Sequence, residues 1–130
     1  MSSSEAPTPY DRIGGAEGVR KLVDRFYDHM SSEEQAASIL KMHPESLLGT
    51  RAKFFEYLSG WLGGPQLYTE KFGHPRLRMR HIHFAIDQSA AEAWMHCMRL
   101  ALEEVVEDKL LREMLRGSFQ RVADHMRNAE

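Results

Sequence analysis

The stretch of sequence that says most about the kind of ligand this chain binds is Gly73–Phe84, with the sequence GHPRLRMRHIHF. Basic and hydrophobic residues alternate along it and lead to His81. An imidazole can bind a metal, arginines such as Arg80 can bind acid groups, and apolar side chains can cover a flat surface. The pattern favours a planar, anionic, metal-bearing ligand, because a single histidine is the usual protein ligand of haem iron in oxygen-binding proteins. The alternative is an ordinary surface or core histidine.

Length and charge restrict the class of protein. A chain of 130 residues is long enough for one hydrophobic core, and we expect a flexible tail over residues 1–9 and one domain over residues 10–130. With a net charge of −2, the chain lacks the excess of basic residues that is typical of nucleic-acid-binding proteins. No stretch reaches the ~20 apolar residues of a membrane span, and the first residues lack a secretory signal. The single cysteine, Cys97, fits a reducing compartment, so we expect the cytoplasm.

Apolar spacing of three and four residues predicts an all-α fold. The predicted helices cover 16–30 after a Gly14-Gly15 hinge, a short segment from Ser31 to Leu40, 44–62, 89–107 and 108–127. Ser31–Glu34 and Ser89–Glu92 are candidate helix caps, and Pro44 suits a first helical turn. Met114 is expected to face inward. Residues 64–75, which include Tyr68, are expected to form a loop, and Gly117 predicts close packing inside the last helix.

Polar aromatic side chains and a histidine fall at positions expected to point inward. Tyr27 lies on the apolar stripe of the first long helix, Trp94 begins the stripe of the helix over 89–107, and His43 stands at a corner before Pro44. Dioxygen held at iron carries partial negative charge, which O–H and N–H donors stabilise. The alternatives are ordinary core aromatics for Tyr27 and Trp94, and a solvated histidine at the helix end.

The helix over 44–62 has a face suited to an apolar ligand with an acidic rim. Thr50, Lys53, Phe54 and Leu58 lie on that face, and Lys53 can reach rim carboxylates while keeping its charge near water. The alternative for Lys53 is an exposed lysine without a ligand.

Other chemistry is poorly supported. Zinc could use His74, His81 and His83, but a pair two residues apart on a helix points to different faces. Cys97 lies on an apolar stripe and is expected to pack, and His29, His96 and His125 are expected to be solvated. No catalytic triad, phosphate-binding glycine loop or paired-carboxylate site stands out, so no catalytic residue is assigned.

The chain resembles the truncated haemoglobins, most closely their second group, from Tyr10 to the last helix. The pieces that carry the resemblance are Tyr10–Gly15, Arg25–Tyr27, Trp61–Pro65, Tyr68, Gly73–His81 and Ala93–Met98. The long run from Gly73 to His81, together with a tryptophan one helix later, is the specific part. The Gly14-Gly15 hinge alone is weak.

The resemblance implies a globin-like two-over-two helical sandwich that encloses haem b. It implies that His81 is the proximal iron ligand and that Thr50, Lys53 and Tyr68 contact the haem or its propionates. It also implies a distal hydrogen-bonding site made by Tyr27, Trp94 and, at the corner, His43. Members commonly have proline where this chain has His83, which leaves a second imidazole two residues from the ligand.

Three functions are consistent with these patterns. The first is a haem protein that binds dioxygen and other diatomic gases for transport, storage or sensing. The second is a haem enzyme that detoxifies nitric oxide or peroxide with electrons from a separate reductase, because the chain has no flavin or nicotinamide motif. The third is a helical interaction module in which His81 and the aromatic residues only fill the core.

Overall fold

The computed structural model describes residues 6–76 and 84–128, and helices account for the regular secondary structure in both ranges. The all-α prediction is therefore confirmed over the described residues. In chain order the elements are α1 (Pro9–Ile13), α2 (Gly15–Ser32), the 3-10 turn η2 (Glu34–Ala36), α3 (Ala37–Leu40), α4 (Leu48–Trp61), α5 (Leu67–Phe72), α7 (Gln88–Val105) and α8 (Lys109–Met126). Among these residues no helix is long and apolar enough to span a membrane.

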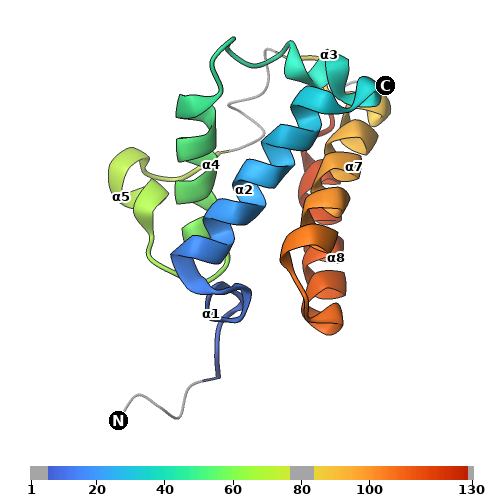
Figure 1. The fold of residues 1–130 in the computed structure, drawn as a ribbon. Coiled ribbons are helices and arrows are strands. Elements are labelled where there is room, and N and C mark those ends of the chain that lie inside the picture. The colour runs from blue at the N-terminus through green and yellow to red at the C-terminus, as the bar shows by residue number, and fades with distance from the viewer. Residues whose placement is uncertain (1–5, 77–83, 129–130) are drawn as a thin grey trace.

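Two antiparallel helix pairs make up the body of the molecule (Figure 1). α2 and α4 form one pair, and α7 and α8 form the other. α2 packs against both α4 and α7, and α7 packs against α8. The short connection over residues 106–108 favours the antiparallel arrangement of α7 and α8. α5 lies beside α4 on the side away from α8 (Figure 1).

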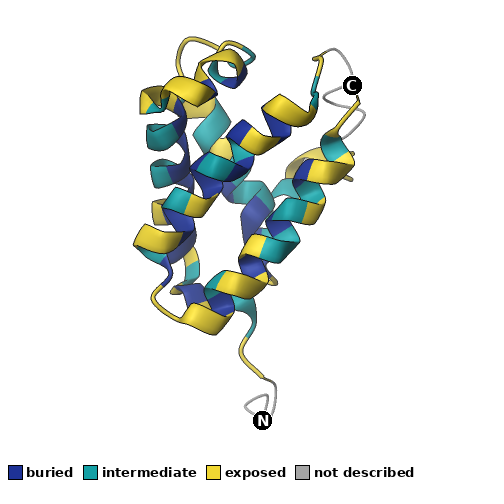
Figure 2. Cartoon of the chain, turned by 90° about the vertical axis from the view of Figure 1, so that its right-hand side faces the viewer, coloured by how far each residue is buried: buried dark blue, intermediate teal, exposed yellow. Residues whose placement is uncertain are grey.

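The core lies where α2, α7 and α8 face one another (Figure 2). Each of these helices has an apolar stripe at helical spacing, and burying these stripes provides the main stabilisation of the fold. The largest fully buried side chains are Phe26, Phe119, Leu22, Met30, Leu58, Met98, Leu102, Leu111, Leu115, Val19, Val23 and Cys97. The packing role expected of Cys97 is confirmed, and burial raises the pKa of its thiol to about 11.

The entry into α2 confirms the predicted hinge. Gly14 adopts a left-handed φ of 109°, ends α1 and precedes the first residue of α2. Thr8 caps α1 through a capping box with Asp11, so a short ordered helix precedes the hinge that the sequence indicated. One turn into α2, a Cβ on Gly18 would lie 2.0 Å from the Ile13 carbonyl oxygen. Glycine is required at that crossing.

Several predicted helix boundaries are wrong. α2 continues through Ser32, so the cap of the next turn falls on Glu33, whose side chain makes no capping bond. The ring of His43 bonds back to the Ile39 carbonyl, which places Pro44 after the end of α3, and α4 begins only at Leu48. The cap of α7 is Asp87 and not Ser89, because the Asp87 carboxylate accepts from the Ala90 amide.

Two further predictions about side chains and loops are also wrong. The expected loop over 64–75 contains α5, whose six residues are too few to show a repeated helical spacing in the sequence. Met114 is 45% exposed, because it lies at the edge of the stripe formed by Leu111, Leu115 and Phe119. Gly117 has no close neighbour, since a Cβ there would meet only the Arg121 Nη1 atom at 3.8 Å.

Candidate functional site

An aromatic group joins α2, α4 and α7 and contains three of the predicted site residues. The Phe26 ring lies 4.8 Å from Tyr27, 5.4 Å from Phe54 and 5.2 Å from Trp94, measured between ring centroids. Phe54 in turn lies 5.9 Å from Tyr27 and 6.3 Å from Trp94. The fold therefore brings Tyr27, Phe54 and Trp94 together. Phe26 is not among the site residues predicted from the sequence, although it contacts the other three rings.

The Tyr27 hydroxyl and the Trp94 indole N–H are uncommitted donors. Neither makes a hydrogen bond within the described part of the chain, although Tyr27 is only 5% exposed and Trp94 is half-buried. Every fully enclosed side-chain polar atom among the described residues has a partner, so both donors border accessible space. Burial raises the pKa of Tyr27 well above its usual value, so the phenol keeps its proton and can donate.

His43 lies next to Tyr27, at the corner that follows α3. The two ring centroids are 5.9 Å apart and the rings meet edge to face. The His43 Nδ1 atom is 2.9 Å from the Ile39 carbonyl oxygen, and because a carbonyl only accepts, Nδ1 carries a proton. This bond fixes the orientation of the half-buried imidazole.

The residues expected at the acidic rim lie along α4 and α5. Tyr57 stacks on Phe54 at 6.4 Å and meets the edge of Tyr68 at 6.2 Å. The Tyr68 ring is 4.8 Å from Phe72, and the ammonium of Lys53 lies 5.4 Å from the centre of the Phe72 ring. Lys53 is exposed, and Thr50 is half-buried in the first turn of α4. Neither Tyr57 nor Phe72 was assigned to the site from the sequence.

The predicted metal ligand lies outside the described residues, together with Arg80 and His83. His74, which belongs to the described part, is exposed and accepts a hydrogen bond from the Arg76 amide at its Nδ1 atom. Within residues 6–76 and 84–128 no three histidine, cysteine or carboxylate side chains are grouped to hold a metal.

A cavity of about 520 Å³ lies between α4 and α8 and is bordered by Tyr57, whose ring stacks on Phe54. None of the described residues that the sequence assigns to the site lines this cavity. Its size falls within the range of cofactor sites. It is lined mainly by apolar residues of the two helices, including Trp61, Leu62, Leu115 and Val122. Outside this cavity, the rings of Tyr27, Phe54 and Trp94, their O–H and N–H donors and the exposed Lys53 are features that suit a planar apolar group with an acidic rim.

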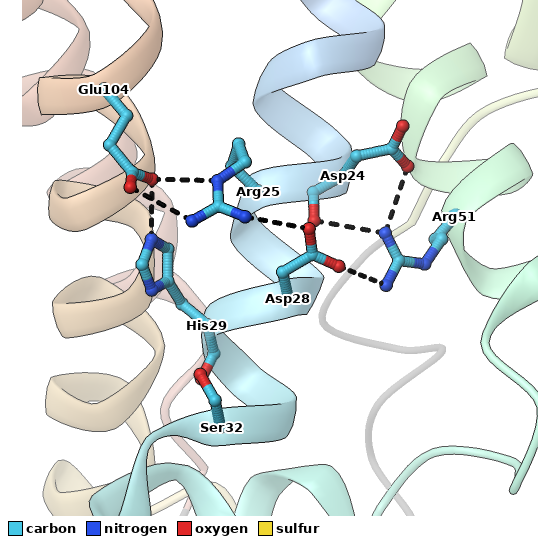
Figure 3. A network of polar contacts seen from close by, with 7 residues as sticks. All are labelled: Asp24, Arg25, Asp28, His29, Ser32, Arg51 and Glu104. Carbon is cyan, nitrogen blue, oxygen red and sulfur yellow. Dashed lines mark hydrogen bonds and ion pairs between the residues drawn. The ribbon is translucent and has the colours of Figure 1, made fainter.

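A network of ion pairs ties α2 to both α4 and α7 (Figure 3). Arg51 of α4 binds the carboxylates of Asp24 and Asp28 at 3.0 and 2.9 Å. Arg25 of α2 binds the other Asp28 oxygen at 3.1 Å and pairs with both Glu104 oxygens at 3.1 and 3.0 Å. The hydrogen bonds that Glu104 accepts from Arg25 and His29 lower the pKa of its carboxyl to about 2.

Two histidines expected to be solvated are instead paired. The His29 Nε2 atom is 2.6 Å from Glu104, and only 15% of its side chain is exposed. The His96 Nε2 atom is 2.8 Å from Glu33. The prediction failed because helical spacing placed both residues off the main apolar stripe without showing that a neighbouring element covers them.

Comparisons with known proteins agree with this geometry. The family of bacterial-like globins matches residues 8–128. The group 2 truncated hemoglobin YjbI of Bacillus subtilis is 41% identical over 120 residues, which are 92% of this chain and 88% of that protein.

Two solved structures superpose on nearly the whole chain. The cold-adapted truncated hemoglobin of the Antarctic marine bacterium Pseudoalteromonas haloplanktis gives a TM-score of 0.94 at 48% identity, over 95% of this chain and 100% of that one. The group II 2-on-2 hemoglobin of the plant pathogen Agrobacterium tumefaciens also gives 0.94, at 45% identity over 100% of both chains. The similarity therefore extends from the elements to their arrangement.

Proposed function

Since this chain belongs to the bacterial-like globin family, we propose that it binds dioxygen and other diatomic gases at haem b, with His81 as the protein ligand of the iron. When bound, the haem supplies an open iron position that holds a diatomic gas. The family implies haem and gas binding. The type of haem, its ligand and the residues around the gas form our proposal.

The observation that carries the proposal is the pair of uncommitted donors, the Tyr27 hydroxyl and the Trp94 N–H. They come from different helices and are held together by Phe26, with ring centroids 4.8 and 5.2 Å away. A protonated phenol and an indole N–H can both donate to a ligand that accepts hydrogen bonds, and bound dioxygen is such a ligand. His43, beside Tyr27, completes the distal side.

The remaining residues are assigned to the cofactor. Phe54 and Tyr68 supply aromatic surface, Thr50 lies one turn before Phe54 on α4, and Lys53 offers an exposed cation at the edge. Lys53 and Arg80 are proposed to neutralise the propionates, because cations bind carboxylates at such rims. No member of this group is assigned a catalytic role.

The test is the rate of dioxygen release from Tyr27→Phe and Trp94→Phe. A hydrogen bond in a dry pocket contributes roughly 1 kcal/mol or more, so each change should speed release about five-fold or more. Tyr10→Phe is the matched control, because Tyr10 lies in α1 against Gly64 and should leave the rate unchanged. Unchanged release in both distal variants would overturn the assignment.

Two donors that retain dioxygen and so slow its release would also suit an enzyme that consumes nitric oxide or peroxide with electrons from a reductase. We keep that activity as the alternative. Turnover of nitric oxide in the presence of a reductant separates it from simple gas binding. We propose the cytoplasm as the location for either activity.

A further inference from the structure

Arg51 links the start of α4 to α2 at the level of Tyr27. Its Nη1 atom donates to the Asp24 carboxylate at 3.0 Å and to the Asp24 carbonyl at 3.1 Å, and its Nη2 atom donates to Asp28 at 2.9 Å (Figure 3). Asp24 and Asp28 lie one turn apart on α2, so their carboxylates share a face. A planar guanidinium matches such a pair of carboxylates better than an ammonium does.

Tyr27 lies on the same side of α2, three residues after Asp24. The Arg51 Cζ atom is 5.8 Å from the centre of the Tyr27 ring, and only 24% of the Arg51 side chain is exposed. The guanidinium therefore covers the outer side of the tyrosine, while Phe26 and Phe54 contact its ring from the core.

The first turn of α4 depends on this link. Leu47 precedes the helix without a side-chain cap, Leu48 is 79% exposed, and a Cβ on Gly49 would meet nothing within 4 Å. Arg51 is the residue of this turn that is anchored to α2 by charged hydrogen bonds. Its anchoring holds Thr50 beside it and Phe54, three residues later, against Tyr27.

We propose that Arg51 is a positioning residue for Tyr27. Arg51 holds the Tyr27 hydroxyl in its donating orientation and sets the distance between α2 and α4 around the bound gas. The inference rests on the proposed role of Tyr27 as a hydrogen-bond donor. The charge of Arg51 also opposes the effect of burial on the pKa of Tyr27, which makes the hydroxyl a stronger donor than burial alone would leave it.

The experiment compares Arg51→Met and Arg51→Lys in the full-length haem-loaded protein, each with Tyr27 and with Tyr27→Phe. Two readouts are measured, the dioxygen release rate and the C–O stretching frequency of the carbon monoxide complex, which reports the field of distal donors. Arg12→Gln is the control, since this substitution removes a single ion pair, the 3.0 Å contact between Arg12 and Asp108, away from Tyr27. Urea unfolding of every variant records the loss of stability separately.

We expect Arg51→Met to speed release about five-fold and to raise the C–O frequency, because residues in one network commonly couple by about 1 kcal/mol. The release rate and C–O frequency of Arg51→Lys should lie between those of Arg51→Met and the unchanged protein. Lysine keeps the positive charge but loses the planar guanidinium that binds both carboxylates. In the Tyr27→Phe background, Arg51→Met should have little further effect. Arg12→Gln should change neither readout.

Other patterns would overturn the inference. Suppose that Tyr27→Phe speeds dioxygen release. If Arg51→Met then lowers only the stability and leaves the release rate unchanged, Arg51 does not work through Tyr27. The same conclusion follows if Arg51→Met changes the release rate equally with Tyr27 and with Tyr27→Phe. If Tyr27→Phe itself changes neither readout, the proposed role of Tyr27 fails, and this inference fails with it. Should Arg51→Met not fold, Arg51→Lys and Asp24→Asn decide by the same criteria.

Discussion

At the scale of single residues, His43 connects two neighbouring segments. Its Nδ1 atom bonds back to the Ile39 carbonyl and its ring meets the edge of Tyr27, so one imidazole both follows the end of α3 and contacts α2. A hydrophobic residue at this position could supply the ring contact but not the hydrogen bond. This dual contact makes His43 a sensitive point of the proposed site.

We predict that dioxygen release becomes slower as the pH falls through the range in which histidines gain a proton, about 8 to 5. Because Nδ1 already carries a proton, protonation adds one at Nε2 and turns that atom from an acceptor into a donor. The release rate measured across this range should lose its pH dependence in His43→Phe. Identical profiles for the two proteins would show that His43 does not act on the ligand.

The assignment of the proximal ligand is also a residue-scale prediction. Removing the sole protein ligand of the iron should abolish or severely weaken haem retention, so His81→Ala should lose the Soret band in the absorption spectrum. His83→Ala is the matched control, two residues away, and should keep a normal band. The opposite result would assign the iron to His83.

At the scale of elements, glycines in two helices have opposite roles. Gly18 lies where α1 crosses α2, and a Cβ there would collide with the Ile13 backbone. Gly117 lies inside α8 with only the end of a flexible arginine nearby. The same residue type is therefore required in one helix and costly in the other.

Gly117→Ala should raise the free energy of unfolding by about 0.5–1 kcal/mol, because alanine lowers the entropy of the unfolded chain and suits a helix interior. Gly18→Ala should lower it by about 1–3 kcal/mol or more, since the backbone must move. Urea denaturation of both variants measures the two effects. A loss of stability in Gly117→Ala would mean that α8 packs more closely there than the structure shows.

At the scale of the whole molecule, the charged network joins the three helices α2, α4 and α7. Arg25 and His29 from α2 converge on Glu104 of α7, while Arg51 of α4 reaches the other side of α2. Partly exposed ion pairs individually contribute little, but a network fixes relative positions. Here it sets how α2 lies between α4 and α7.

The lowered pKa of Glu104 predicts a loss of stability in acid. Its carboxyl titrates at about 2 in the folded protein and near the usual value of 4.5 in the unfolded chain. Its stabilising contribution is therefore fully present above pH 4.5 and disappears as the pH falls toward 2. The difference in unfolding free energy between the unchanged protein and Glu104→Gln should shrink between pH 5 and 3. A constant difference would show that Glu104 is not linked to folding through its charge.

The sequence by itself determined the helical class, the family and the long amphipathic helices. These features depend on local spacing: Val19, Leu22, Val23 and Phe26 lie on one face of α2 in any structure with 3.6 residues per turn. The same spacing placed Tyr27 and Trp94 on inward faces. The resemblance carried by the run from Gly73 to His81 added the haem, and the comparisons confirm the family and the two-over-two fold.

Only the tertiary structure decided how those faces meet. The observed helix ends differ from the predicted ones because caps depend on which neighbouring groups are available. Asp87 caps α7, and the ring of His43 bonds back to the last turn of α3. Arg51 meets Asp24 and Asp28, residues 27 and 23 positions away, and no local pattern marks such a pair. Contacts between distant segments depend on the packing of whole helices, and for that reason periodicity identified the Tyr27 position but not the arginine that packs beside it.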